Sequence, residues 1–194
     1  MSKGTIIYYG GFTLPDKSAS ANRVVSNGKI FEKLGYKTVF IGASDDTFDG
    51  LRPVEGCENM FEHAHPNSTK QWLMHMLSVE HIEAVMKNYS NVKKIILYNV
   101  PMFTLLKAKK VFSKKSIEVC YDCTEWTKDT DGSLPKRIFK AFDEILISNF
   151  AHKVADGMIA ISRMMEKKYK SSKNLLILPP LVDINDKIWH QVPE

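Results

Sequence analysis

Residues able to do chemistry are concentrated in one short stretch, Tyr121-Asp122-Cys123-Thr124-Glu125-Trp126-Thr127. Asp122 and Glu125 are carboxylates three residues apart, and such groups can orient and polarise a hydroxyl. The ring of Trp126 could stack on a sugar. We therefore expect Asp122 and Glu125 to be catalytic candidates and Trp126 to bind substrate. Structural alternatives are a turn-forming Asp122 and a Trp126 that anchors the core.

A second candidate is Gly10-Gly11, which directly follows the apolar run at residues 5–9. Glycines let the backbone approach a ligand closely, and N–H groups beside a helix N-terminus can hold phosphate. Asn22 and Arg23 lie near the start of the next predicted helix, where a guanidinium can bind phosphate or carboxylate. The fingerprint G-x-G-x-x-G is absent from this loop, which weighs against NAD or FAD. A plain glycine turn and a solvated arginine are the alternatives.

Cysteine and histidine spacings give little support for a redox or metal site. Cys120 and Cys123 have the C-x-x-C spacing, but one falls in a predicted strand and the other in a loop, whereas redox pairs usually begin a helix. His63 and His65 have no second pair at a ligand spacing. We expect these histidines to be surface or strand residues, and we expect neither a metal nor a cofactor.

These residues must be positioned by apolar runs that alternate with amphipathic stretches. Strands are predicted over residues 5–9, 37–42, 93–100, 117–121, 157–161 and 175–178, with at most a short one near 59–62. Helices are predicted over about 19–34, 68–89 and 101–113, from residue 133 onward, and after the capping residue Ser162. This alternation predicts an α/β fold, a Rossmann-like three-layer sandwich with a mainly parallel sheet.

Ligands of such a sheet bind at the carboxyl ends of the strands, where the strand order reverses. Asn99 ends the 93–100 strand and should face the same side as the Gly10-Gly11 loop. Capping of the following helix is its alternative role.

Length and composition indicate one ordinary soluble domain, with 194 residues of which 44% are apolar. No run approaches the ~20 apolar residues of a membrane span, and the first residues do not resemble a signal peptide, so we expect a cytoplasmic protein. The net charge is +5, and +4 of it lies in residues 98–194. In the helix after residue 133, Lys136, Arg137 and Lys140 form a basic arc opposite an apolar face. That pattern suits peripheral contact with the inner face of a membrane, and equally a solvated face over a packed one.

Four segments, taken in order, resemble the N-terminal half of a family 4 type glycosyltransferase with the GT-B fold. They are the first strand with Gly10-Gly11, the helix from Ala21-Asn22-Arg23 to Leu34-Gly35, Asp156-Gly157-Met158-Ile159-Ala160-Ile161-Ser162, and Leu178-Pro179-Pro180-Leu181-Val182-Asp183. The resemblance covers nearly the whole chain. Where many members have a histidine, this sequence has Asp122, so the role of that histidine is not carried over.

The resemblance implies a retaining transfer of a sugar from a nucleotide-sugar donor to a glycan or lipid-linked acceptor, in cell-surface polysaccharide synthesis. It implies that residues 1–184 form the acceptor-binding domain, with Gly10 and Gly11 against the donor diphosphate and Ser162 near the cleft. Residues 185–194 resemble the start of the interdomain linker, and the donor-binding domain has no counterpart in this sequence. We expect the 194-residue chain alone to be inactive and to have no nucleic acid partner. The alternatives are a non-catalytic subunit that recruits a split glycosyltransferase to the membrane and, ranked last, a nucleotide-dependent oxidoreductase or epimerase suggested by Asp45.

Overall fold

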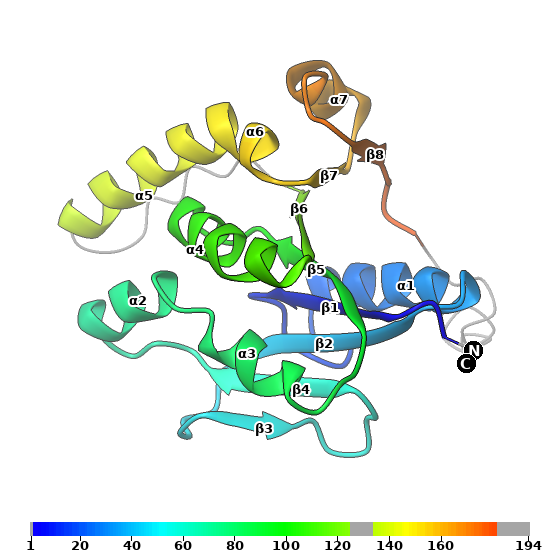
Figure 1. Ribbon diagram of the computed structural model, residues 1–194. Coiled ribbons are helices and arrows are strands. Elements are labelled where there is room, and N and C mark those ends of the chain that lie inside the picture. Colours follow the sequence, from blue (N-terminus) through cyan, green and yellow to red (C-terminus); the bar gives the residue numbers. More distant parts are fainter. Residues whose placement is uncertain (1, 125–133, 182–194) are drawn as a thin grey trace, which may run out of the picture.

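The computed structural model describes residues 2–124 and 134–181, with the side chains of residues 135 and 136 left undescribed. Eight strands form one sheet in the order β3-β4-β2-β1-β5-β6-β7-β8 (Figure 1). The bounds are β1 Thr5–Gly10, β2 Lys37–Ser44, β3 Leu51–Pro53, β4 Met60–Ala64, β5 Val92–Tyr98, β6 Glu118–Cys123, β7 Gly157–Ala160 and β8 Leu175–Ile177. All neighbouring pairs are parallel except β3 and β4.

Helices cover both faces of this sheet. Helix α1 (Ala19–Lys33) packs on one face, where its Ala21 and Val24 meet Tyr8 and Phe40. The other face carries α3 (Glu80–Met86), α4 (Met102–Phe112) and α7 (Arg163–Tyr169) over a larger apolar cluster that includes Ile95. The predicted α/β sandwich with a mainly parallel sheet is therefore confirmed.

Two further helices lie at the side to which the arrowheads of β1 and β4 point, as Figure 1 shows. They are α2 (Thr69–Met76) and α5 (Leu134–Leu146), which is followed by a π-helical turn, Ile147–Ala151, and the short α6, His152–Val154. The ring of Phe139 on α5 contacts Trp72 on α2 and Phe103 on α4, with centroid distances of 5.3 and 5.8 Å. Aromatic contacts thus join these helices beyond the carboxyl edge of the sheet.

The prediction of one helix over 68–89 is wrong, because the chain turns between α2 and α3. The hydroxyl of Thr104 donates to the carbonyl of Met76 at the end of α2 (2.8 Å), and the hydroxyl of Ser78 accepts from the N–H of Glu80 as α3 begins (3.1 Å). Ser68 caps α2, since its hydroxyl accepts from the N–H of Gln71.

The structure also contains β3, which the polar sequence of residues 43–58 did not predict. This short edge strand pairs antiparallel with β4. A salt bridge from Arg52 to Glu62 holds the two strands together at 2.6 Å, and Arg52 also contacts Asp46. The pairing of β3 with β4 depends on contacts between charged side chains. The periodicity of apolar residues, from which strands are predicted, does not detect such contacts.

Candidate functional site

The strand order reverses between β1 and β5, because β2 lies on one side of β1 and β5 on the other. In open α/β sheets this switch point, at the carboxyl ends of the strands, is where ligands bind. The loop after β1 starts there with Gly10 and Gly11, and Asn99 follows β5 on the same edge. The structure thus brings three of the predicted substrate-binding residues to one place.

The two glycines of this loop have different surroundings. A Cβ on Gly10 would lie 2.6 Å from the carbonyl oxygen of Tyr98, so only glycine allows β1 and β5 to approach this closely. Gly11 is exposed, and a Cβ there would have no heavy atom within 4 Å. The rest of the loop is held in place, since Phe12 and Leu14 are fully buried and the Phe12 carbonyl accepts from the N–H of Ala43 (2.9 Å). The result is a fixed loop with an open stretch of backbone at Gly11.

Asn99 holds the backbone that follows β6. Its side-chain N–H donates to the hydroxyl of Thr124 (2.6 Å), and its side-chain oxygen accepts from the N–H of Thr124 (3.0 Å). The cap of α4 comes from elsewhere: the carboxylate of Asp143 on α5 accepts from the N–H of Met102 at 2.9 Å. Burial raises the pKa of Asp143 to about 6, although the hydrogen bond from Met102 favours the ionised form. Sequence reasoning missed Asp143, because nothing in the order of residues shows that α5 meets the start of α4.

Asp122 lies in a buried polar network beneath α1. One carboxylate oxygen accepts from Arg23 (3.2 Å), and the other accepts from the hydroxyl of Tyr8, which also accepts from the amide of Asn27 (3.2 Å). Arg23 donates in addition to the carbonyl of Leu178 after β8 (2.9 Å). Asp122 is 0% exposed and Arg23 only 6%. In this conformation neither side chain faces solvent, so the solvated-arginine alternative is wrong.

The same burial determines the electrostatics of the network. Burial raises the pKa of Asp122, while the nearby guanidinium and the hydrogen bond from Tyr8 oppose that rise. Burial also raises the pKa of Tyr8 well above 10, with a further contribution from the charge of Asp122. Asp122 therefore has the surroundings of a positioning residue, which fixes α1 and the end of β8 through Arg23.

Two of the remaining predicted site residues, Asn22 and Ser162, lie elsewhere along the carboxyl edge. Asn22 is exposed on the first turn of α1. Ser162 follows β7 and caps α7, its hydroxyl accepting from the N–H of Met165 (3.4 Å). Glu125 and Trp126 lie outside the described residues. Their proposed roles, like those of Asn22 and Ser162, stay predictions.

The C-x-x-C spacing does not produce a cysteine pair. Cys120 and Cys123 both lie in β6. Successive side chains of a strand point to opposite faces, so two residues three positions apart lie on opposite faces of the sheet. Cys123 packs in the cluster under α4, and Cys120 lies against the cluster on the α1 face. The three cysteines are thiols, and this geometry excludes an internal disulfide between Cys120 and Cys123.

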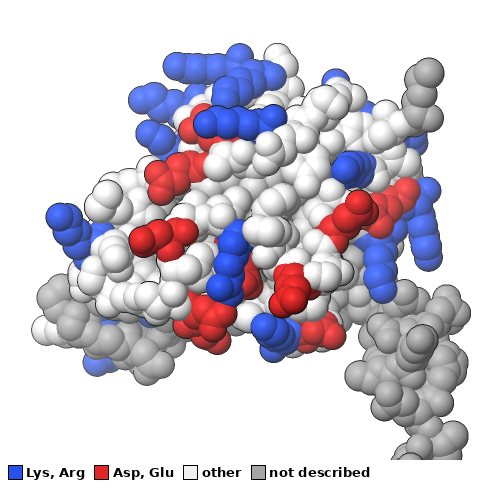
Figure 2. All heavy atoms as spheres, turned by 90° about the horizontal axis from the view of Figure 1, so that it is seen from below, with Lys and Arg blue, Asp and Glu red and all other residues white. Residues whose placement is uncertain are grey.

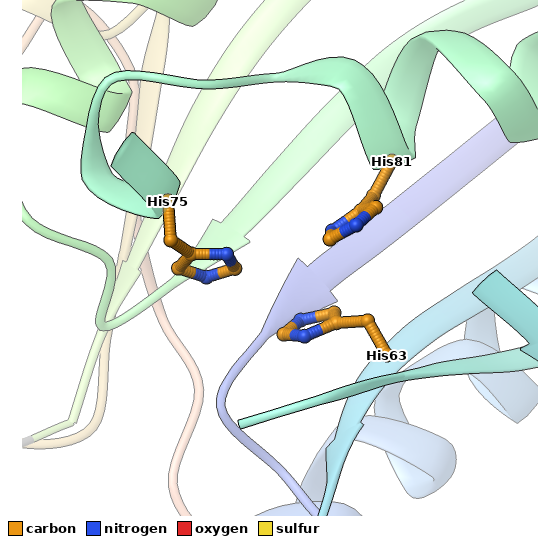
Figure 3. A group of neighbouring side chains, drawn as sticks. All are labelled: His63, His75 and His81. Carbon is orange, nitrogen blue, oxygen red and sulfur yellow. The ribbon is translucent and has the colours of Figure 1, made fainter. Parts of the chain in front are cut away.

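Three histidines come together near the end of β1, on the face opposite α1. His63 is the next-to-last residue of β4, His75 lies in the last turn of α2, and His81 lies in the first turn of α3 (Figure 3). His63 is only 3% exposed and lies in β4, so of the two expected settings, surface or strand, it has the strand. His65, by contrast, is exposed and lies 3.8 Å from Asp45.

Burial lowers the pKa of all three clustered histidines. The values for His75 and His81 fall to about 4, first through desolvation and then through repulsion by the neighbouring rings. Desolvation likewise lowers the pKa of His63. At neutral pH the cluster therefore consists of uncharged imidazoles. Sequence reasoning missed it because residues 63, 75 and 81 have no motif spacing and meet only through the break between α2 and α3.

The apolar face of α5 is exposed. Its members are 51–67% exposed, namely Leu134, Ile138, Phe142 and Ile145. The helix contacts the rest of the protein instead through Phe139 and Asp143. Arg137 is exposed and Lys140 half-buried, whereas the Lys136 side chain lies outside the described atoms. The structure therefore leaves most of the apolar face of α5 exposed, while Leu146 at its end packs against the core.

Charge elsewhere on the surface is mixed. On the face shown in Figure 2, acidic side chains are spread over the middle, and basic side chains form their largest group at the upper margin, with others along the remaining margins. No described helix is both long and apolar enough to cross a membrane.

Comparisons with known proteins give similarity at the level of solved structures. No family model matches the chain, and no curated protein does. The similar structures include an alpha-glucosyltransferase in complex with UDP and a 13-mer DNA containing a HMU base, and one in complex with UDP-glucose and DNA containing an abasic site. Each has a TM-score of 0.47 and 15% identity, over 95% of this chain and 44% of the other. A third, alpha-glucosyltransferase in complex with UDP, has a TM-score of 0.45 and 14% identity, over 93% and 45%.

This chain thus spans less than half the length of the glycosyltransferases that it resembles in structure. Several of those structures contain DNA. The sequence-based exclusion of nucleic acid as a partner is therefore wrong: proteins with this kind of fold are found in complex with DNA.

Proposed function

We propose that this chain is the acceptor-side domain of a retaining glycosyltransferase that uses a nucleotide-sugar donor and acts on a glycan or lipid-linked acceptor. The observation that carries the proposal is the open backbone at Gly11, located at the switch point of the sheet in the loop that connects β1 to α1. A diphosphate there would meet backbone N–H groups without a side chain in the way. The ordered resemblance to family 4 type enzymes supports the same assignment.

In this proposal the buried network positions the site. Arg23 and Asp122 hold α1 against β6 and the end of β8, so the loop before α1 keeps its place relative to the ends of β5 and β6. Asn99 does the same for the backbone at Thr124, beyond which the predicted acceptor residues Glu125 and Trp126 follow. The donor-binding domain is then a separate unit, and the 194-residue chain alone binds without transferring sugar.

The test is a nuclear magnetic resonance titration of the ¹⁵N-labelled chain with UDP and UDP-glucose. We expect saturable shifts of the amides of Gly10, Gly11 and Phe12 in the wild type and their loss in Gly11→Val. Ser171→Val, on an exposed residue after α7, serves as the matched control and should titrate like the wild type. Saturable shifts confined to other regions, or unchanged shifts in Gly11→Val, would refute the proposal.

Transfer assays extend this test. The wild-type chain, incubated with a panel of nucleotide sugars and with glycan, lipid-linked and DNA acceptors, is expected to give no glycosylated product. Sustained turnover by this chain alone would contradict its assignment as one side of a two-domain catalyst.

A second candidate function is recruitment of a partner glycosyltransferase to an anionic membrane, and the exposed apolar face of α5 favours it. An interfacial helix buries such a face at the lipid boundary, while basic side chains contact anionic headgroups. Ile138 is 63% exposed, and the exposed Arg137 is its neighbour on this helix.

Flotation with liposomes containing phosphatidylserine tests this function. Ile138→Ser combined with Phe142→Ser should reduce the bound fraction at least fivefold. Met164→Ser, which removes an equally exposed apolar side chain from α7, should leave it unchanged. Charge reversal of Lys136, Arg137 and Lys140 to Glu should also release the protein. No flotation of the wild type, or equal flotation of all variants, counts against the function.

A further inference from the structure

The histidine cluster has the composition of a transition-metal site. The ligand nitrogens of His63, His75 and His81 all lie within 4.8 Å of one another. Figure 3 shows the three rings directed toward a common space, each from a different element. Centroid distances are 4.6 Å between His63 and His81, 4.8 Å between His63 and His75, and 5.9 Å between His75 and His81. Three neutral imidazoles meeting in this way are a donor set that suits zinc and its neighbours in the first transition row.

Two of the rings are already oriented by hydrogen bonds to their second nitrogen. Nδ1 of His63 lies 3.0 Å from the carbonyl oxygen of Ala64, which can only accept, so Nδ1 carries the proton and Nε2 has the free lone pair. Nε2 of His75 lies 3.2 Å from the hydroxyl of Tyr9, which leaves Nδ1 of His75 to face the other rings. Partners of this kind fix the tautomer of metal-binding histidines and raise their basicity.

Solvent reaches the cluster from the side of His81. An open groove of about 770 Å³ lies between α3 and the start of β3, and its lining includes His81, Glu80, Glu83 and Lys87. The groove gives an ion a route to the rings and leaves space for water or another ligand at a fourth position.

We propose that His63, His75 and His81 bind one divalent transition-metal ion, with Zn²⁺ as the natural occupant and a fourth position open toward the groove. A zinc–nitrogen distance of about 2.0–2.1 Å places tetrahedral ligand nitrogens about 3.3 Å apart, so the rings must close by roughly 1.5 Å. Side-chain rotation of His75 and His81 at their helix ends supplies this movement. The bound ion would join β4, α2 and α3. The proposal does not depend on the glycosyltransferase assignment.

Isothermal titration of the 194-residue chain with Zn²⁺, after removal of any polyhistidine tag and treatment with a chelator, tests the site. We expect one ion per chain with a dissociation constant in the micromolar range or below. Tyr9→Phe removes a hydrogen-bond partner of His75 and should weaken Zn²⁺ binding roughly 10–100-fold. His75→Gln or His81→Gln removes a ligand and should weaken binding by more than that. His65→Gln is the matched control, because His65 is close in sequence but outside the cluster, and it should bind like the wild type.

Two further measurements keep the test independent of variant folding. The wild-type melting temperature should rise with Zn²⁺ concentration, since an ion that binds only the folded state stabilises it. Co²⁺ should give the intense visible absorption of a four-coordinate site. Absence of saturable Zn²⁺ binding by the wild type would overturn the proposal, and so would equal binding by wild type and folded His81→Gln, or loss of binding in His65→Gln.

Discussion

The ion pair between Arg23 and Asp122 offers the sharpest quantitative test of the buried network. Asp122→Asn keeps the size of the side chain but leaves the Arg23 guanidinium buried at 6% exposure without a counter-charge. Removing one partner of a buried pair typically costs about 3–5 kcal/mol. For a chain of this length about 1 kcal/mol corresponds to about 2–4 °C, so the melting temperature should fall by roughly 6–20 °C.

Urea unfolding, followed by circular dichroism and fluorescence, measures these costs for Asp122→Asn, Arg23→Met and the double variant. The double variant removes both charges, so we expect it to be more stable than the sum of the single losses by at least about 2 kcal/mol. Glu118→Gln breaks the exposed cross-strand pair with Lys94 on the neighbouring strands, and should cost less than about 1 kcal/mol.

Two outcomes would refute the reasoning. One is a cost for Asp122→Asn no larger than that for Glu118→Gln, which would mean that the buried charge finds water or another partner. The other is strict additivity in the double variant, which would mean that the two side chains do not interact energetically.

Further predictions concern the loop, α4 and the histidines. Gly10→Ala should cost about 1–3 kcal/mol, because its Cβ would overlap the neighbouring strand, whereas Gly11→Ala should stay within about 0.5 kcal/mol; equal costs in urea unfolding would contradict the geometry. Asp143→Ala should cost about 1–2 kcal/mol by removing the cap of α4, and a thermal melt unchanged from the wild type would argue against it. The lowered pKa values of His75 and His81 mean that, as the pH falls, these side chains take up protons in the unfolded chain before they do so in the folded protein. Their contribution to the free energy of unfolding is therefore complete above about pH 6.5 and declines toward pH 4. At pH 5 in metal-free buffer, each of these rings should lower the free energy of unfolding by about 1–2 kcal/mol. The difference in unfolding free energy between wild type and His75→Gln should therefore narrow by that amount from pH 7 to pH 5. A constant difference would show that the pKa of His75 is not lowered in the folded protein.

The larger part of the fold could be predicted from the sequence because apolar periodicity follows burial directly. Runs such as residues 95–98 are buried on both faces of the sheet, and their alternation with amphipathic helices favours a parallel sheet. The break between α2 and α3 could not be predicted, because the three residues of the turn leave the apolar residues before and after it at helical spacing. Met76 and Ile82 both remain buried on either side of it.

Prediction of the site was limited for a different reason. Sequence places Asp122 at a strand end, but it does not show that α1 covers that side of β6 and brings Arg23 onto the carboxylate. A buried structural carboxylate and an accessible catalytic one have the same local sequence pattern. The histidine cluster is harder still, because it depends on three elements whose relative positions come only from tertiary structure.

The contacts of Arg23 also constrain the order in which the chain can fold. Its two partners, Asp122 and the carbonyl of Leu178, lie 99 and 155 residues further along the chain. At a synthesis rate of about 5–20 residues per second, the second partner is made roughly 8–30 s after Arg23 itself. Until Asp122 has been made, docking of α1 would bury the Arg23 guanidinium without its counter-charge. Docking of α1 with a paired arginine therefore requires synthesis of β6, and the last contact of Arg23 forms only after β8 has been made.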